Sequence, residues 1–195
     1  MKSKLFIDGR NFLGKLEDVF ESENKPVPEW ATYDFRALLD HVLKGIKIDE
    51  QIFYFAKIKE HPHTKEKSQE LILQRRLLKT SLERQGFKVI LSGAVRGNYK
   101  KNEQGKDILV FKEKGVDISI AVDMVAAACD KLLKTAILAS SDSDLQPAIR
   151  ELNKRGVESI YLGFEMMPNK GLTATTKRTI LIRNSEVIQF NQKAK

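Results

Sequence analysis

The sequence predicts an α/β fold, a three-layer α/β/α sandwich in which helices cover both faces of a largely parallel sheet. Short apolar runs that stop abruptly at polar residues, such as residues 136–139, are typical of strands buried on both faces. Between these runs, apolar residues recur at helical spacing. Strands that alternate with helices imply parallel pairing. At 195 residues, we expect one domain over residues 1–195 with a substantial core.

The first part of the chain reads as strand, helix, loop and helix. Residues 2–7 are the first predicted strand, and it ends at Asp8. The helix after it is expected to bury Phe12, Leu13, Leu16, Val19 and Phe20. Residues 21–30 are acidic and contain Pro26 and Pro28, which indicates a loop. Thr32 is the predicted N-cap of a second helix that ends at Gly45 and buries Phe35, Leu38, Leu39 and Val42.

The middle of the chain repeats the alternation. Residues 52–56 are the second buried strand, and a long helix over residues 65–85 ends at Gly86. His61 and His63, between them, are interpreted as surface residues because no third metal ligand is near in the sequence. Residues 87–91 form the third predicted strand, and residues 92–114 are expected to form a basic hairpin or mobile loop.

The last part begins with an almost wholly apolar helix over residues 116–129. Residues 136–139 are the fourth strand, and the helix after it ends near Gly156. Residues 157–162 are the fifth strand. The basic tail contains two further strand candidates, at residues 179–182 and 187–190.

Charge and composition limit the classes of partner and compartment. The net charge of +8 is concentrated in residues 57–114, which suggests a polyanionic partner such as RNA, although a solvated helix face is an equally ordinary explanation. No apolar stretch reaches the length of a membrane span or a signal peptide, so no membrane partner is expected. The single cysteine, Cys129, is interpreted as a small core residue and favours a reducing, cytoplasmic setting. A homodimer is left open.

Acidic side chains are predicted to gather at one edge of the sheet. Asp8 ends the first strand and Asp142 follows the fourth, so neighbouring parallel strands would bring them together. Asp117 lies in the first turn of a helix too apolar to face water, where a lone carboxylate is costly to bury. Converging carboxylates repel one another, and oxygen ligands favour Mg²⁺ or Mn²⁺. The competing interpretation of residues 140–144 is ordinary helix capping by Ser and Asp.

Three motifs together resemble the NYN domain family of the PIN-like nuclease superfamily. They are IDGRN at residues 7–11, KGVDISIAVDM at residues 114–124 and SSDSDL at residues 140–145. The resemblance covers most of the chain and implies a PIN-like α/β/α sandwich with metal-dependent ribonuclease chemistry. The chain departs from the family at Ser141, where bacterial members often carry glycine; serine is expected to alter the loop slightly and to leave the carboxylates in place.

The resemblance also assigns the site. It implies that the metal ligands are Asp8, Asp117, Asp142 and Asp144. Asn11 matches a polar partner that would orient a ligand or the phosphate. Asp123 matches a supporting acid, and Ser140 and Ser141 would support the same loop.

The expected function is therefore a metal-dependent endoribonuclease that hydrolyses RNA phosphodiester bonds with Mg²⁺ or Mn²⁺. The alternatives are an RNA-binding module that keeps the acidic pocket and cleaves slowly or not at all, and a regulatory scaffold that binds a protein through its loops. A dehalogenase-type phosphatase would need an acid where Arg10 stands, and a nucleotide-binding fold would need a glycine-rich turn after the first strand. The residues expected to bind the RNA are Arg96, Lys100, Lys101, Lys106, Lys177 and Arg178.

Overall fold

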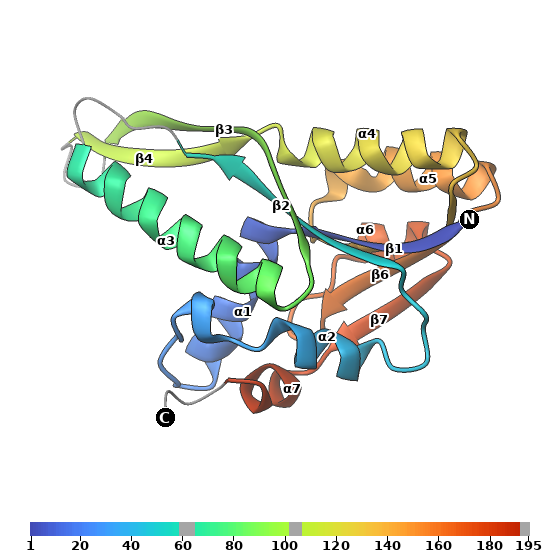
Figure 1. Cartoon of the computed structure of the whole chain (residues 1–195), viewed down its shortest axis with the longest axis horizontal. Helices are drawn as coiled ribbons and strands as arrows, with labels where there is room; N and C mark the ends of the chain where they lie inside the picture. Colours follow the sequence, from blue (N-terminus) through green and yellow to red (C-terminus); the bar gives the residue numbers. More distant parts are fainter. Residues whose placement is uncertain (59–64, 102–106, 192–195) are drawn as a thin grey trace.

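The computed structural model describes residues 1–58, 65–101 and 107–191, and leaves out the side chains of residues 66–67, 96–100 and 107–113. In these ranges the chain forms one seven-stranded sheet in the order β4-β3-β2-β1-β5-β6-β7 (Figure 1). Only β4 runs antiparallel to its neighbour, so the expectation of a largely parallel sheet is confirmed. The strands span Lys2–Asp8 (β1), Glu50–Lys57 (β2), Lys88–Lys101 (β3), Asp107–Lys114 (β4), Leu133–Ala139 (β5), Glu158–Phe164 (β6) and Arg178–Ile182 (β7).

Helices cover both faces of the sheet, which confirms the three-layer sandwich (Figure 1). On one face α1, α2, α3 and α7 pack against Leu5 and Ile7 of β1, and on the other face α4, α5 and α6 pack against Phe6. This division follows from the alternation of side chains along a strand. The helices span Gly9–Ser22 (α1), Phe35–Val42 (α2), Lys65–Arg84 (α3), Val116–Cys129 (α4), Gln146–Lys154 (α5), Lys170–Thr175 (α6) and Asn184–Gln189 (α7).

The strand order reverses between β1 and β5. From β1 the chain builds outward through β2 and β3, and it then returns to place β5 on the other side of β1. In open α/β sheets such a reversal leaves a crevice at the carboxyl ends of the strands, because the helices that follow the two strands go to opposite faces. Here α1 follows β1 on one face and α5 follows β5 on the other. The fold therefore prepares a site where Asp8 and Asp142 emerge.

The basic segment between β3 and α4 projects beyond that edge. β3 pairs with β2 only as far as Ala94, opposite Lys57, and from Ala94 to Lys101 it pairs antiparallel with β4. The outer part of β3 and β4 therefore extends past the carboxyl ends of β1 and β2. Figure 1 shows this pair reaching out alongside α3.

Several local predictions were wrong. Residues 187–190 do not form a strand: they belong largely to α7, where Val187 is fully buried and Glu186 accepts a hydrogen bond from the backbone N–H of Arg183 at 2.8 Å. A short apolar run does not distinguish a strand from one turn of buried helix. Helix α6 was missed altogether, and Cys129 is exposed instead of lying in the core.

The N-cap of α2 was also misplaced. Thr32 lies in a 3₁₀ turn, Trp30–Thr32 (η1), and Asp34 caps α2 by accepting a hydrogen bond from the Ala37 N–H at 2.9 Å. His61, His63 and Lys106 lie outside the described residues. Among the helices in the described ranges, none has both the length and the apolar character needed to cross a membrane.

Candidate functional site

The ends of β1 and β5 lie side by side at the carboxyl edge of the sheet. Ile7 pairs with Ala139, so Asp8 stands level with Ser140, the first residue after β5. Asp8 is 7% exposed and caps α1, and its Oδ1 accepts a hydrogen bond from the Asn11 N–H at 3.1 Å. A carboxylate offers about four acceptor positions, and the capping bond to Asn11 occupies one of them.

The loop after β5 presents the next two acids. Ser140 is buried, and its Oγ accepts a hydrogen bond from the Asp142 N–H at 3.2 Å. Asp142 caps the 3₁₀ turn Ser143–Leu145 (η3), with its Oδ1 accepting from the Asp144 N–H at 2.8 Å. Asp142 is half-buried and Asp144 is exposed. The capping interpretation of this loop is therefore correct in its geometry, and it does not exclude ligation by the same carboxylates.

Hydrogen bonds lock this loop to α1. The side-chain oxygen of Asn11 accepts from both the N–H and the hydroxyl of Ser141, each at 2.9 Å. Asn169, the N-cap of α6, donates from its Nδ2 to the Ser141 carbonyl at 2.9 Å. Ser141 thus joins α1, the loop and α6. The Ser141 hydroxyl makes a specific bond to Asn11, so this serine adds a contact between the two acidic strand ends.

The strands before α4 bring its first turn to the same edge. Lys114 at the end of β4 pairs with Ala94 in β3, which in turn pairs with Lys57 at the end of β2. Gly115 then adopts a left-handed conformation with φ of 87°, which a glycine takes without strain, and α4 begins. Asp117 is therefore positioned at the carboxyl edge, in the layer that covers Phe6.

Asp117 holds a buried oxygen with no protein partner. One and two turns further along α4, Ile120 and Met124 are fully buried against the sheet, and Asp117 lies on their side of the helix. Its Oδ1 is buried and accepts no hydrogen bond. Asp8 follows Phe6 by two residues in β1 and so belongs to the same layer. A carboxylate oxygen left bare in this layer is costly unless a ligand satisfies it.

Asp123, the second acid of α4, has a supporting contact. Its Oδ2 accepts a hydrogen bond from the Tyr54 hydroxyl at 2.8 Å. Burial raises the pKa of Tyr54, and the hydrogen bond and charge of Asp123 raise it further, so the phenol stays protonated and donating. Tyr54 is paired with Asp8 across β1 and β2. This contact fixes α4 over the sheet beside Asp8.

The acidic side chains at this edge offer oxygen donors, the type of ligand that a hard divalent cation prefers. Asp8, Asp117 and Asp142 supply carboxylate oxygens from three elements, and Asp117 supplies one that the protein leaves unsatisfied. Of the side chains that the structure describes, no lysine or arginine forms an ion pair with Asp117, Asp142 or Asp144. Across the same residues, no three His, Cys, Asp or Glu side chains form a ready metal-binding group. Mg²⁺ is commonly held by one or two carboxylates, with waters and substrate phosphates completing its shell.

The residues expected to bind RNA fall into two separate groups. Lys101 is exposed, and Arg96 and Lys100 belong to the part of β3 that projects past the acidic edge. Lys177 and Arg178 are exposed at the opposite edge, because Arg178 pairs with Ile160 near the start of β6. The outer part of β3 therefore lies on the side of the acidic edge, whereas Lys177 and Arg178 lie at the other end of the strands.

Two residues of the site were missed from the sequence, namely Tyr54 and Asn169. Asn169 lies before a short apolar-spaced segment, and an Asn there is an N-cap signal that could have located α6. Nothing in the sequence indicates its contact with Ser141, 28 positions away. Tyr54 looks like any aromatic residue of a buried strand.

Comparisons with known proteins agree with this description. The family model of the NYN domain matches residues 2–183. The crystal structure of a protein of unknown function from Vibrio parahaemolyticus RIMD 2210633 is similar, with a TM-score of 0.60 and 16% identity over 93% of both chains. At that identity the likeness supports the fold alone. None of the curated proteins matches the chain.

Proposed function

Because the chain belongs to the NYN domain family, whose members share a PIN-like nuclease fold, we propose that it is a metal-dependent endoribonuclease that hydrolyses RNA phosphodiester bonds. The observation that carries the proposal is the bare, buried Oδ1 of Asp117 at the edge where Asp8 and Asp142 emerge from adjacent strands. Helix capping explains Asp8 and Asp142, but it does not explain the buried, unsatisfied oxygen of Asp117.

In this proposal Asp8, Asp117 and Asp142 would hold Mg²⁺ or Mn²⁺, with Asp144 as a fourth, more exposed carboxylate. Such a cation activates water and stabilises charge on a phosphate when bound. Asn11 holds the Asp142 loop at a fixed distance from α1 through Ser141, so the acids on the two strands keep their relative position. Asp123 acts through Tyr54, outside the cation-binding set.

The RNA backbone would approach from the side of the hairpin. Its projecting part carries Arg96, Lys100 and Lys101, and it leads through β4 directly into the helix that bears Asp117. Cations at that place bind phosphates of any sequence and orient the strand across the acidic edge. The position of Lys177 and Arg178 at the opposite edge gives no support for a direct role of those two residues.

A second candidate is an RNA-binding module that does not cleave. It is favoured by the capping bonds, because Asp8 and Asp142 each have a structural use that would preserve them without catalysis. Both candidates bind RNA, so only the chemistry separates them.

The deciding experiment is incubation of the protein with a mixed RNA pool, with Mn²⁺ or Mg²⁺ and with excess chelator. We expect cleavage that the chelator abolishes. Asp142→Asn should lose at least about 100-fold in rate, because a charge that stabilises the transition state is removed while Asn still caps η3.

The matched control is Asp34→Asn, which changes an N-cap acid of α2 away from the acidic edge. It should cleave like the wild type. If Asp142→Asn stays folded and fully active, or if cleavage persists in excess chelator, metal-dependent cleavage at this site is refuted. RNA binding without any cleavage favours the binding module.

A further inference from the structure

A second concave surface lies on the opposite side of α1 from the Asp142 loop. It is a cleft of about 420 Å³ between α1, the segment around Trp30 and the helix α3. This volume is in the usual range for small-molecule sites. Its apolar walls include Leu13, Trp30, Leu71 and Leu78, and its polar groups include Arg10, Glu17, Gln74 and Arg75.

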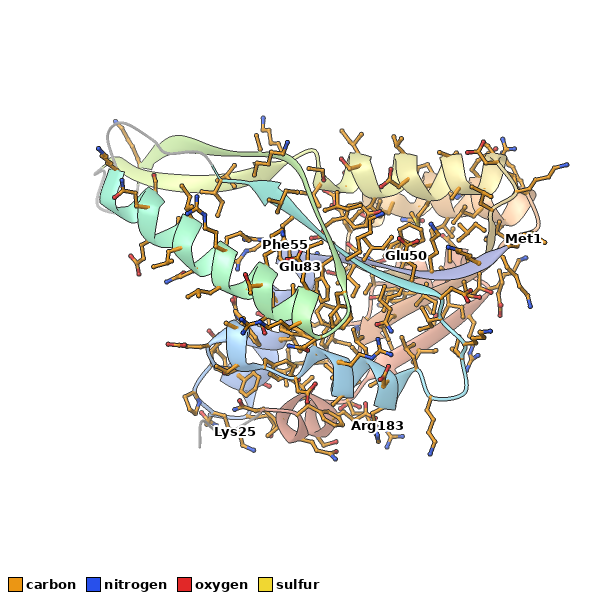
Figure 2. All side chains as sticks on the ribbon, viewed as in Figure 1. Met1, Lys25, Glu50, Phe55, Glu83 and Arg183 are labelled. Carbon is orange, nitrogen blue, oxygen red and sulfur yellow. The ribbon has the colours of Figure 1, made fainter. Side chains whose placement is uncertain are left out.

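The first turn of α1 connects the cleft to the acidic edge. Arg10, at its mouth, is two residues after Asp8 in the first turn of α1. Gly9, between them, packs so closely on Phe55 that an added Cβ would overlap the ring. Arg75 of α3 lies over the other part of this contact, with its guanidinium 4.0 Å from the centre of the Phe55 ring. Figure 2 shows Phe55 beside α3.

The walls of the cleft suit a flat, amphipathic group. Trp30 packs edge-on against Tyr33 and Phe20, which hold the indole firmly at the cleft wall. Leu77, 55% exposed, extends the apolar wall toward solvent. A rigid aromatic and aliphatic surface of this kind binds a nucleobase in a sequence-tolerant way.

The polar groups of the cleft favour some bases over others. The Glu17 carboxylate lies inside the cleft, where its Oε1 accepts from Trp30 Nε1 at 3.4 Å and from Arg10 Nη1 at 3.5 Å. A carboxylate held this way accepts readily from base N–H groups. Guanine presents two adjacent N–H donors on one edge, whereas the single ring N–H of uracil is flanked by carbonyl oxygens that a carboxylate repels.

We propose that this cleft binds one unpaired base of the RNA, guanine in preference to uracil, next to the phosphate at the acidic edge. Arg10 then faces the backbone between base and phosphate, and Glu17 faces the base. The inference rests on the proposed RNA cleavage for its substrate, and it adds a sequence preference close to the cut.

Trp30 gives a direct readout, because it is the chain's single tryptophan. The first test needs no metal ion. The full chain is titrated with GMP, UMP or ribose 5-phosphate in the presence of chelator, and binding is monitored through the fluorescence of Trp30. We expect a saturable change with GMP, binding of UMP at least about tenfold weaker, and no change with ribose 5-phosphate. No response to GMP, or equal binding of both nucleotides, overturns the proposal.

Two variants test the assigned groups. Glu17→Gln should lose the preference for GMP over UMP, while Glu21→Gln, exposed on the same helix and outside the cleft, should keep it. Should Glu17→Gln fail to fold, Leu77→Glu, at an exposed position, should weaken GMP binding at least about tenfold through repulsion of the phosphate. An unchanged GMP preference in Glu17→Gln, or undiminished GMP binding in Leu77→Glu, refutes the assignment.

An RNA substrate tests whether the cleft binds a base within a strand and not only a free nucleotide. On a U-rich oligonucleotide with one guanosine, the wild type should cut next to the guanosine and Glu17→Gln should cut without positional preference. Cleavage without positional preference in the wild type overturns the base-subsite proposal while the nuclease proposal stands. GMP binding without any cleavage refutes the nuclease proposal and retains the cleft as a guanine-binding site.

Discussion

The substitution Asp117→Ala should raise the stability of the metal-free protein and abolish its response to metal. Asp117 has a buried Oδ1 with no hydrogen-bond partner, and leaving such an oxygen bare costs about 1–3 kcal/mol. Alanine is also the better helix former, by up to about 0.7 kcal/mol. Against this, an acid in the first turn of α4 interacts favourably with the helix dipole, by about 0.3–1 kcal/mol. The net gain is then roughly 1–2 kcal/mol.

The gain is measurable by thermal unfolding in chelator. For a chain of 195 residues, 1 kcal/mol corresponds to about 2–4 °C, so Asp117→Ala should raise Tm by about 2–8 °C. In the wild type, Mn²⁺ at 100 times its Kd should add about 2.7 kcal/mol and raise Tm by about 5–11 °C. The variant should show little of this increase, because one of its proposed ligands is gone.

The matched control is Asp130→Ala, which removes an exposed acid at the other end of the same helix. It should change the free energy of unfolding by no more than about 0.5 kcal/mol and keep the full Mn²⁺ response. A lower Tm for Asp117→Ala in chelator would show that the carboxylate has a structural partner. An undiminished Mn²⁺ response would place the cation elsewhere.

Three further predictions concern binding, the loop and alkaline pH. Replacing the three hairpin cations with Gln should reduce the salt dependence of RNA binding: the slope of the logarithm of the binding constant against log salt should fall by up to about 2 for single-stranded RNA, at about 0.7 per phosphate contact. The same change at residues 177–178 should leave this slope unchanged, and an equal effect of both changes would exclude the hairpin as the specific binding surface. Asn169→Ala should lower Tm by about 3–8 °C, because it loses the N-cap of α6 and the bond to Ser141, and it should also slow cleavage. Asn169→Asp should recover the cap but not the cleavage rate; full recovery of the rate would show that the Ser141 contact does not contribute to cleavage. Burial raises the pKa of Tyr54, so the unfolded chain releases that proton first and the free energy of unfolding should fall as pH rises above 10, less steeply in Tyr54→Phe; identical alkaline profiles would contradict the buried phenol. The hairpin cations are Arg96, Lys100 and Lys101.

Much of the candidate site was predictable because its residues mark the ends of locally encoded elements. Asp8 and Asp142 each follow an apolar run, and the end of a buried strand is readable from the run itself. The position of Asp117 in the first turn of an apolar helix was also visible, and so was the conflict between a carboxylate and a buried face. These features depend on periodicity and on the cost of burying charge, and both act over a few residues.

The failures came from segments whose local signal is ambiguous. Residues 187–190 are apolar enough for a strand, but the capping bond between Arg183 and Glu186 and the burial of Val187 select the helix α7. Cys129 follows the buried Ala128 in a helix that is apolar on several sides, so composition alone did not show which side meets the core.

By itself, the sequence determined the alternation of strands and helices, and with it the parallel sheet and the acids at its carboxyl edge. Only the tertiary structure decided which strands are neighbours, and the order of the sheet then set every long-range relation of the site. It placed β5 beside β1, joined Ser141 to Asn11 and Asn169, carried Arg178 to the far edge, and opened a cleft between α1 and α3. The physical reason is that backbone conformation is encoded by neighbouring residues, whereas contacts between distant segments depend on how all the buried faces pack together at once.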